Sequence, residues 1–390
     1  MKKIFIKSTL IIFSIVLSFY FSFKHARAKE LPFGVQTMAG AIIDKHSRLK
    51  SLPSPKLITI GGSNAMFGFD SEYMERRLKI PVQNMALGAS LGLTFMLNEV
   101  REDLKKDDIV LLSLEYYLDE GDENIKLFLV ELYPQSEKYV EYKNNYERFK
   151  INCNYVFREL RNYLLFSLLS TDKIHNDEVY GREAFNKNGN IKEELRLKAK
   201  LALNDVKILG KKDYAESIAK INMFIKYAKS KQAKVFFVFP PLAEIQYKEN
   251  FEAIEDIYIQ YQKKLEAQIL NKPTDSVYPD SCFYDTIYHL RSPYHTTHAI
   301  KVMKNLEKYW SIKQQPTIGN VNSMSYPNLQ IASNVKLKGN NIINSIIKNV
   351  EEVRPLKLPS IKKCKIFPSI IKLPSSQVQV SASASKSPNN

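Results

Sequence analysis

Short apolar runs alternate with segments of helical spacing in the first part of the chain. The runs 57–60, 81–87 and 107–114 have the length of buried strands. Between them, apolar residues recur at helical spacing over 71–79 and 91–105. The order strand, helix, strand, helix, strand predicts a parallel sheet with right-handed crossovers.

The same alternation resumes late in the chain. A predicted helix over 213–229 precedes the apolar run 233–239, which two prolines end. Helical spacing follows over 251–270, Phe283–Tyr284 is predicted as a last short strand, and 296–310 as the closing helix. We therefore predict an α/β fold, a three-layer sandwich whose parallel sheet has about five strands.

The remaining segments define the expected domain organisation. The α/β domain is predicted over 56–312, with a Tyr-rich helical insertion at about 120–212. Residues 29–55 are expected to be an irregular lead-in, with Ser71 as the cap of the helix after the first strand. The polar, Asn- and Ser-rich segment 313–390 is expected to be a disordered tail of low complexity.

The first 28 residues carry the features of a targeting segment. Lys2 and Lys3 precede an uncharged run from Ser8 to Phe23, and an Ala-Arg-Ala triplet ends at Ala28. This pattern predicts a secretory signal peptide, with an uncleaved membrane anchor as the alternative. Both interpretations place the rest of the chain outside the cytoplasm, as a periplasmic, secreted or membrane-anchored protein.

Composition excludes some classes of protein. The net charge is +16, but the lysines are scattered, and zinc-finger spacing and aromatic RNA-binding signatures are missing. We therefore predict no nucleic-acid partner. The three cysteines lie far apart, without metal-ligand spacing, so neither a zinc site nor a disulfide framework is expected.

The candidate chemistry centres on Ser63, which follows an apolar run and two glycines. This position is at the carboxyl end of a predicted strand, where open α/β sheets bind ligands. A serine hydroxyl becomes a nucleophile when a base takes its proton and a third group orients the base. His289 and Asp285, after the last predicted strand, supply these two groups. The backbone N–H groups of Gly88 and Asn64, and that of Ser63, are candidate oxyanion donors.

Two other interpretations concern neighbouring residues. His289, His295 and His298 with Asp285 offer a His-x-x-His metal pattern, but the glutamate of a zinc-hydrolase helix is missing from it. We therefore predict no metal and no cofactor. Glu115, at the end of the third predicted strand, either faces a substrate or acts as a cap or lysine partner.

These segments together resemble the SGNH (GDSL-like) hydrolase superfamily. The resemblance rests on Gly-Gly-Ser63-Asn, on the glycine of Met-Ala-Leu-Gly88 and on Asp285-Thr-Ile-Tyr-His289. It is with the extracytoplasmic bacterial branch, which includes proteins of teichoic acid D-alanylation and alginate O-acetylation. It implies a flavodoxin-like fold, with Ser63 as nucleophile, His289 as base, Asp285 as its orienting group and Gly88 as an oxyanion donor.

The resemblance implies an extracytoplasmic serine esterase or O-acyltransferase that acts on acyl or acetyl esters of a cell-envelope glycan. The expected partners are an acylated glycan or another ester substrate and a membrane-bound acyl-transfer protein. The family's third block, Gly-x-Asn-Asp, is missing, so Asn64 or Asn84 would have to replace its asparagine. The alternative is a catalytically inactive SGNH-like envelope protein that binds an anionic polymer or an assembly partner.

Overall fold

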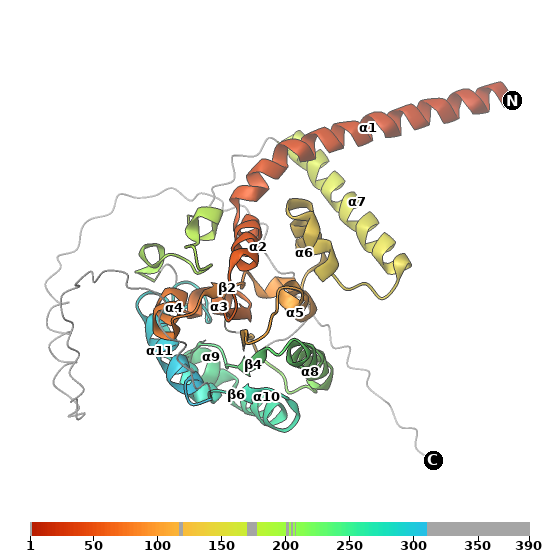
Figure 1. Ribbon diagram of the computed structural model, residues 1–390. Coiled ribbons are helices and arrows are strands. Elements are labelled where there is room, and N and C mark those ends of the chain that lie inside the picture. The colour runs from red at the N-terminus through yellow and green to blue at the C-terminus, as the bar shows by residue number, and fades with distance from the viewer. Residues whose placement is uncertain are drawn as a thin grey trace, which may run out of the picture. The chain divides into compact units, whose positions relative to one another are not determined.

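The computed structural model describes residues 2–116, 120–169, 178–199, 203, 206 and 208–309. Five parallel strands form one sheet in the order β2-β1-β3-β4-β6, with helices on both faces (Figure 1). The predicted three-layer α/β sandwich is therefore confirmed. Its strands are β1 (Leu57–Gly61), β2 (Val82–Asn84), β3 (Ile109–Ser113), β4 (Lys234–Phe237) and β6 (Gln268–Ile269).

A second, two-stranded parallel sheet pairs β5 (Leu242–Ala243) with β7 (Val277–Tyr278). The α-helices are α1 (Lys2–Gln36), α2 (Ala41–Ser51), α3 (Ser63–Gly68), α4 (Ser71–Leu78), α5 (Leu93–Arg101), α6 (Glu123–Leu132), α7 (Asn145–Leu169), α8 (Ala215–Ser230), α9 (Glu244–Glu249), α10 (Phe251–Lys264) and α11 (Tyr294–Leu306). Short 3₁₀ turns join them, among them η1 (Met38–Gly40), η4 (Glu178–Tyr180) and η6 (Glu193–Arg196).

Alternate residues of the central strands belong to different cores, because successive side chains of a strand point to opposite faces. Ile58 and Val110 pack into the core that contains α5, α8 and α10. Leu57 and Ile109 pack into the core that contains α3, α4 and α11. Figure 1 shows α4 and α11 on one side of the strands and α5 and α8 on the other. Both faces are covered, which explains why these strands are continuous apolar runs.

The pairing of β1 with β3 fixes which residues meet at the carboxyl edge of the sheet. The strands pair in parallel from Leu57 opposite Ile109 to Gly61 opposite Ser113. At the amino edge, the buried ammonium of Lys56 donates to the Asp108 carboxylate at 2.7 Å. The residues that follow Gly61 and Ser113 therefore emerge side by side.

The predicted last strand at Phe283–Tyr284 is wrong, because the fifth strand of the sheet is β6. Phe283 forms only a single antiparallel bridge with Leu290, and Tyr284 N–H donates to the His289 carbonyl at 2.7 Å. Segment 283–290 thus folds back on itself as a closed loop. The apolar pattern of this segment reflects the burial of its aromatic residues in the core and not membership of the sheet.

The irregular lead-in predicted for 29–55 is also wrong. α1 continues to Gln36, and α2 packs its buried Ile42 and Leu49 into the core. The helix α4 begins at Ser71, but its cap is Asp70, whose carboxylate accepts from Tyr73 N–H. Asp70 is the cap because it immediately precedes the helix and its carboxylate reaches the Tyr73 N–H. Ser71 is already the first residue of the helix.

The insertion is helical in α6 and α7, as predicted, and returns to the domain through 178–199. The uncharged run 8–23 and the Ala-Arg-Ala triplet lie within α1, and among the described residues no helix is long and apolar enough to cross a membrane. The predicted tail, 313–390, lies outside the described residues. The signal peptide stays a prediction.

A first prediction concerns acid stability. Burial lowers the pKa of His298 from 6.5 to about 3 and that of His295 to about 2. Both imidazoles therefore stay neutral in the folded protein, whereas the unfolded chain takes up protons below about pH 6.5. The free energy of unfolding should fall as the pH drops below that value, by about 1.4 kcal/mol per pH unit for each histidine.

Urea unfolding from about pH 7 to about pH 4 measures this slope. His298→Asn keeps a polar group for the Tyr278 hydroxyl, which lies 3.2 Å from His298 Nδ1. This variant should reduce the slope by the share of one histidine. An unchanged slope would show that His298 does not titrate on unfolding.

Candidate active site

Ser63 is the first residue of α3, directly after β1, at the carboxyl edge of the sheet. The glycines before it allow close packing. A Cβ on Gly61 would lie 2.1 Å from the Ser113 carbonyl oxygen. A Cβ on Gly62 would lie 2.8 Å from Glu115 Oε1 and 2.9 Å from Ala89 N. Side chains at these positions would separate the segments that surround Ser63.

The hydroxyl of Ser63 is hydrogen-bonded to Glu115. Ser63 Oγ donates to Glu115 Oε1 at 3.2 Å, and the backbone N–H of Asn64 donates to the same oxygen, also at 3.2 Å. Glu115 is 5% exposed. The expected hydrogen bond from Ser63 to His289 is not present between these two described residues. Glu115 therefore caps the first turn of α3, one of the two roles expected for it, and the same carboxylate oxygen also contacts the Ser63 hydroxyl.

His289 and Asp285 form the predicted pair. Asp285 Oδ1 lies 2.7 Å from His289 Nδ1, and both side chains are almost completely buried. The Tyr180 hydroxyl donates to the other carboxylate oxygen of Asp285 and lies 3.3 Å from His289 Nδ1. A carboxylate at Nδ1 favours the tautomer with its proton there, which leaves Nε2 as the basic nitrogen.

Phe67 connects this pair to the helix that carries Ser63. The rings of Phe67 and His289 stack with centroids 4.1 Å apart and planes within 7° of parallel. Phe67 lies four residues after Ser63 in α3, so the two residues occupy neighbouring positions one turn apart. The early serine and the late histidine thus belong to one cluster, although no hydrogen bond joins them in this conformation.

The residues predicted as oxyanion donors differ in how they lie relative to Ser63. Gly88 lies next to Ala89, whose N atom approaches Gly62, and a Cβ on Gly88 would meet nothing closer than 3.5 Å. The buried Asn64 amide donates to the Ser113 carbonyl and hydroxyl oxygens at 3.0 and 3.2 Å, so only its backbone N–H faces the site. Asn84 donates to the Ala65 carbonyl at 2.9 Å and supports α3 instead of replacing a catalytic asparagine.

Arg196, which lies in the insertion, stabilises the loop 283–290 that carries His289. Its guanidinium is 1% exposed and donates to the carbonyl oxygens of Phe67 and Leu290. These residues are the stacking partner of His289 and its neighbour in the chain. Burial lowers the pKa of Arg196 to about 10, and Glu193 and Asp70 oppose this shift. The sequence offers no pattern that identifies this role.

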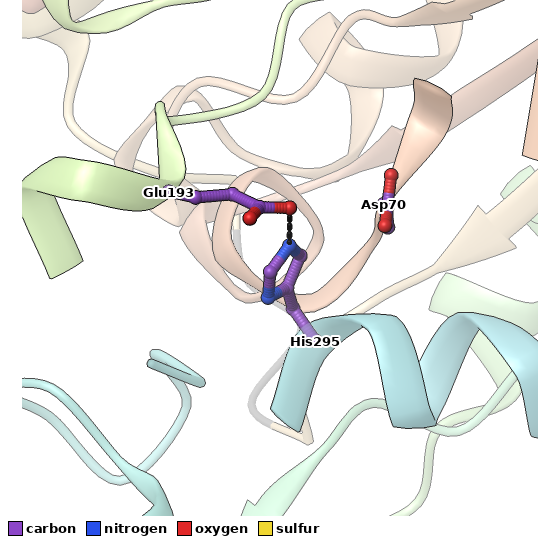
Figure 2. A group of neighbouring side chains, drawn as sticks. All are labelled: Asp70, Glu193 and His295. Carbon is purple, nitrogen blue, oxygen red and sulfur yellow. Dashed lines mark hydrogen bonds and ion pairs between the residues drawn. The ribbon is translucent and has the colours of Figure 1, made fainter. Parts of the chain in front are cut away.

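One group of side chains could offer ligands to a metal ion. Figure 2 shows Glu193 of η6, Asp70 before α4 and His295 of α11 converging, and one ligand atom of each lies within 4.8 Å of the others. His295 Nε2 lies 3.2 Å from Glu193 Oε1. However, Arg196 already supplies a positive charge to both carboxylates.

The other ring nitrogen of His295, Nδ1, is buried without a hydrogen-bond partner among the described residues. Histidines that bind metals usually donate from that second nitrogen to an acceptor. We therefore assign the Asp70–Glu193–His295 group to charge balance around Arg196. The predicted alternative of a shared metal site is not assembled, because His289 pairs with Asp285, His295 with Glu193 and His298 with Tyr278.

Comparison with known proteins adds no assignment, because no protein-family model and no curated protein sequence matches the chain. The sequence pattern predicts Ser63, His289 and Asp285 as site residues, and the structure pairs His289 with Asp285 but not with Ser63. The sequence pattern did not assign a role to Phe67, although this residue lies one helical turn after Ser63. It also assigned no role to Tyr180 or Arg196, because both lie in the insertion, far from Ser63 and His289 along the chain.

A second prediction tests the support from Arg196. Arg196→Met should lower the free energy of unfolding by about 3 kcal/mol, because two buried carbonyl oxygens lose their donor and two carboxylates lose a nearby positive charge. The matched control is Arg182→Met, which removes the more exposed pair with Asp44 and should cost less than about 1 kcal/mol. Urea unfolding of both variants provides the comparison. Equal losses would contradict a special role for Arg196.

Proposed function

We propose that this protein is a serine esterase or O-acyltransferase of the cell envelope, with Ser63 as nucleophile. The observation that supports this most directly is the pairing of His289 with Asp285 at 2.7 Å, combined with the stacking of His289 on Phe67 of the helix that begins at Ser63. A buried imidazole oriented by a carboxylate, packed on the helix that begins with a serine at the sheet edge, supplies the types of base and nucleophile that acyl transfer requires.

In the proposed reaction, His289 Nε2 accepts the proton of Ser63 Oγ as this oxygen forms a bond to the ester carbonyl carbon. The tetrahedral intermediate collapses, the carbon–oxygen bond to the alcohol breaks, and the alcohol leaves with the proton from His289. Water or a sugar hydroxyl then attacks the acyl-enzyme, again losing its proton to His289, and Ser63 is released. Hydrolysis and transfer differ only in this second nucleophile.

The developing oxyanion requires N–H donors beside Ser63. The backbone N–H of Asn64 already donates toward the site, and the Gly88–Ala89 segment approaches Gly62. Each such donor contributes a few kcal/mol of transition-state stabilisation in known enzymes. We therefore assign the stabilisation of the oxyanion to Asn64 N–H and to the backbone N–H groups around Gly88.

The substrate we propose is an acyl or acetyl ester on a cell-envelope glycan, delivered or received through a membrane-bound acyl-transfer partner. Two features support an extracytoplasmic place. The apolar residues of α1 between Ile6 and Phe21 are largely exposed, as in a segment that meets a membrane or a translocation machinery. The net charge of +16 favours anionic envelope polymers.

One observation favours the second candidate, a catalytically inactive envelope protein that binds a polymer or an assembly partner. Ser63 Oγ is held by Glu115 at 3.2 Å and not by His289. A carboxylate near the nucleophile also opposes a developing negative charge. The two candidates are distinguished by whether Ser63 reacts.

A third prediction makes this distinction. A fluorophosphonate probe should label the wild-type protein, and Ser63→Ala should abolish labelling. His289→Ala should reduce the labelling rate by about 10²- to 10⁴-fold, because the serine loses its base. The control is His298→Asn, which changes a buried histidine away from the site. Absence of labelling in the folded wild-type protein and in folded variants of Glu115, the residue that holds the Ser63 hydroxyl, would favour the binding protein.

A fourth prediction concerns Tyr180. Tyr180→Phe removes the hydroxyl that donates to Asp285 and leaves the ring in place. The orientation of His289 should loosen, and kcat for a model ester should fall about 3- to 30-fold with little change in KM. Steady-state kinetics measures both constants. A change confined to KM would instead assign Tyr180 to substrate binding.

A further inference from the structure

Glu115 lies beside Ser63, the proposed nucleophile, and accepts a hydrogen bond from its hydroxyl. We propose that Glu115 is an autoinhibitory residue, whose carboxylate occupies the Asn64 N–H and binds the Ser63 hydroxyl until an ester displaces it. This inference rests on the proposed function. In this resting state, which precedes the reaction, Glu115 regulates Ser63. Glu115 is not one of the predicted catalytic residues.

The geometry places one carboxylate oxygen among the groups that the reaction needs. Glu115 Oε1 accepts from Ser63 Oγ and from Asn64 N–H, both at 3.2 Å. The same oxygen lies 2.8 Å from the position of a Cβ on Gly62, and Ala89 N lies 2.9 Å from that position. Glu115 Oε1 thus contacts the nucleophile and one proposed oxyanion donor, and it approaches the same side of Gly62 as the segment around Ala89.

The chemistry of the two states explains why they exclude one another. A carboxylate oxygen and the oxygen of a tetrahedral intermediate both carry negative charge and both require N–H donors. They cannot share Asn64 N–H, and at 5% exposure Glu115 is poorly screened by water. The Ser63 hydroxyl that donates to Glu115 is also unavailable to donate to His289 Nε2. The carboxylate must therefore move before Ser63 reacts.

The position of Glu115 in the fold permits such a movement without loss of the sheet. β3 ends at Ser113, two residues before Glu115. Glu115 therefore lies on the segment of chain that leaves the sheet. The β1–β3 pairing ends at the Gly61–Ser113 pair and does not include it. A purely structural role, in which Glu115 only ties this segment to α3, is the competing explanation.

The test compares rates of fluorophosphonate labelling of Ser63 in full-length wild type, Glu115→Gln and Glu115→Ala. Removing the charge should accelerate labelling roughly ten- to a hundredfold, the range expected for loss of a hydrogen bond to a charged group. Glu115→Ala serves as the second variant if Glu115→Gln does not fold. The control, Glu99→Gln, removes an equally buried glutamate that pairs with His46, and it should leave the rate unchanged.

A labelling rate that stays the same or falls in folded Glu115 variants, while Ser63 of wild type reacts, would overturn the autoinhibitory role and leave the proposed function intact. No labelling in wild type or in any variant would remove both. A crystal structure of the wild-type phosphonate adduct gives a readout independent of rate. In it, Glu115 should no longer lie within hydrogen-bond distance of Asn64 N, and a carboxylate that stays in place would contradict the proposal.

Discussion

The parallel pairing of β1 with β3 is the constraint on which the rest of the structure depends. It runs from Leu57 opposite Ile109 to Gly61 opposite Ser113, and the buried ion pair of Lys56 with Asp108 closes its amino end. A shift of this register by one residue would turn every core side chain to the other face of the sheet. It would also separate Ser63 from Glu115. The stability of the sheet and the composition of the site are therefore decided by the same set of backbone hydrogen bonds.

The second part of the site is attached to the first through aromatic and ionic contacts. The loop 283–290 presents His289 to Phe67, and Arg196 donates to the carbonyl oxygens of Phe67 and of the residue after His289. The insertion thus supplies both a support, Arg196, and a partner for Asp285, Tyr180. It is part of the site, so the site depends on three stretches of chain that are far apart in the sequence.

These contacts carry a cost in stability. The ammonium of Lys45 is buried, which lowers its pKa to about 7, and it donates to two carbonyl oxygens. Buried charges and neutral buried histidines are unfavourable relative to the unfolded chain unless their hydrogen bonds compensate. The Lys45 ammonium joins β2 to the insertion through the carbonyl oxygens of Asn84 and Gly189, and the two buried histidines lie in α11. Polar contacts of this kind fix the orientation of the groups that they join.

The sequence by itself determined the α/β class, the strands β1 to β4 and the chemical types of the site, because apolar periodicity and glycines after a strand are local signals. It also gave the pairing of His289 with Asp285, which are close in the chain. Only the tertiary structure decided that β6 and not Phe283–Tyr284 completes the sheet, and that Ser63 donates to Glu115. Contacts between distant segments depend on register and on loop paths, and no local pattern encodes either of them.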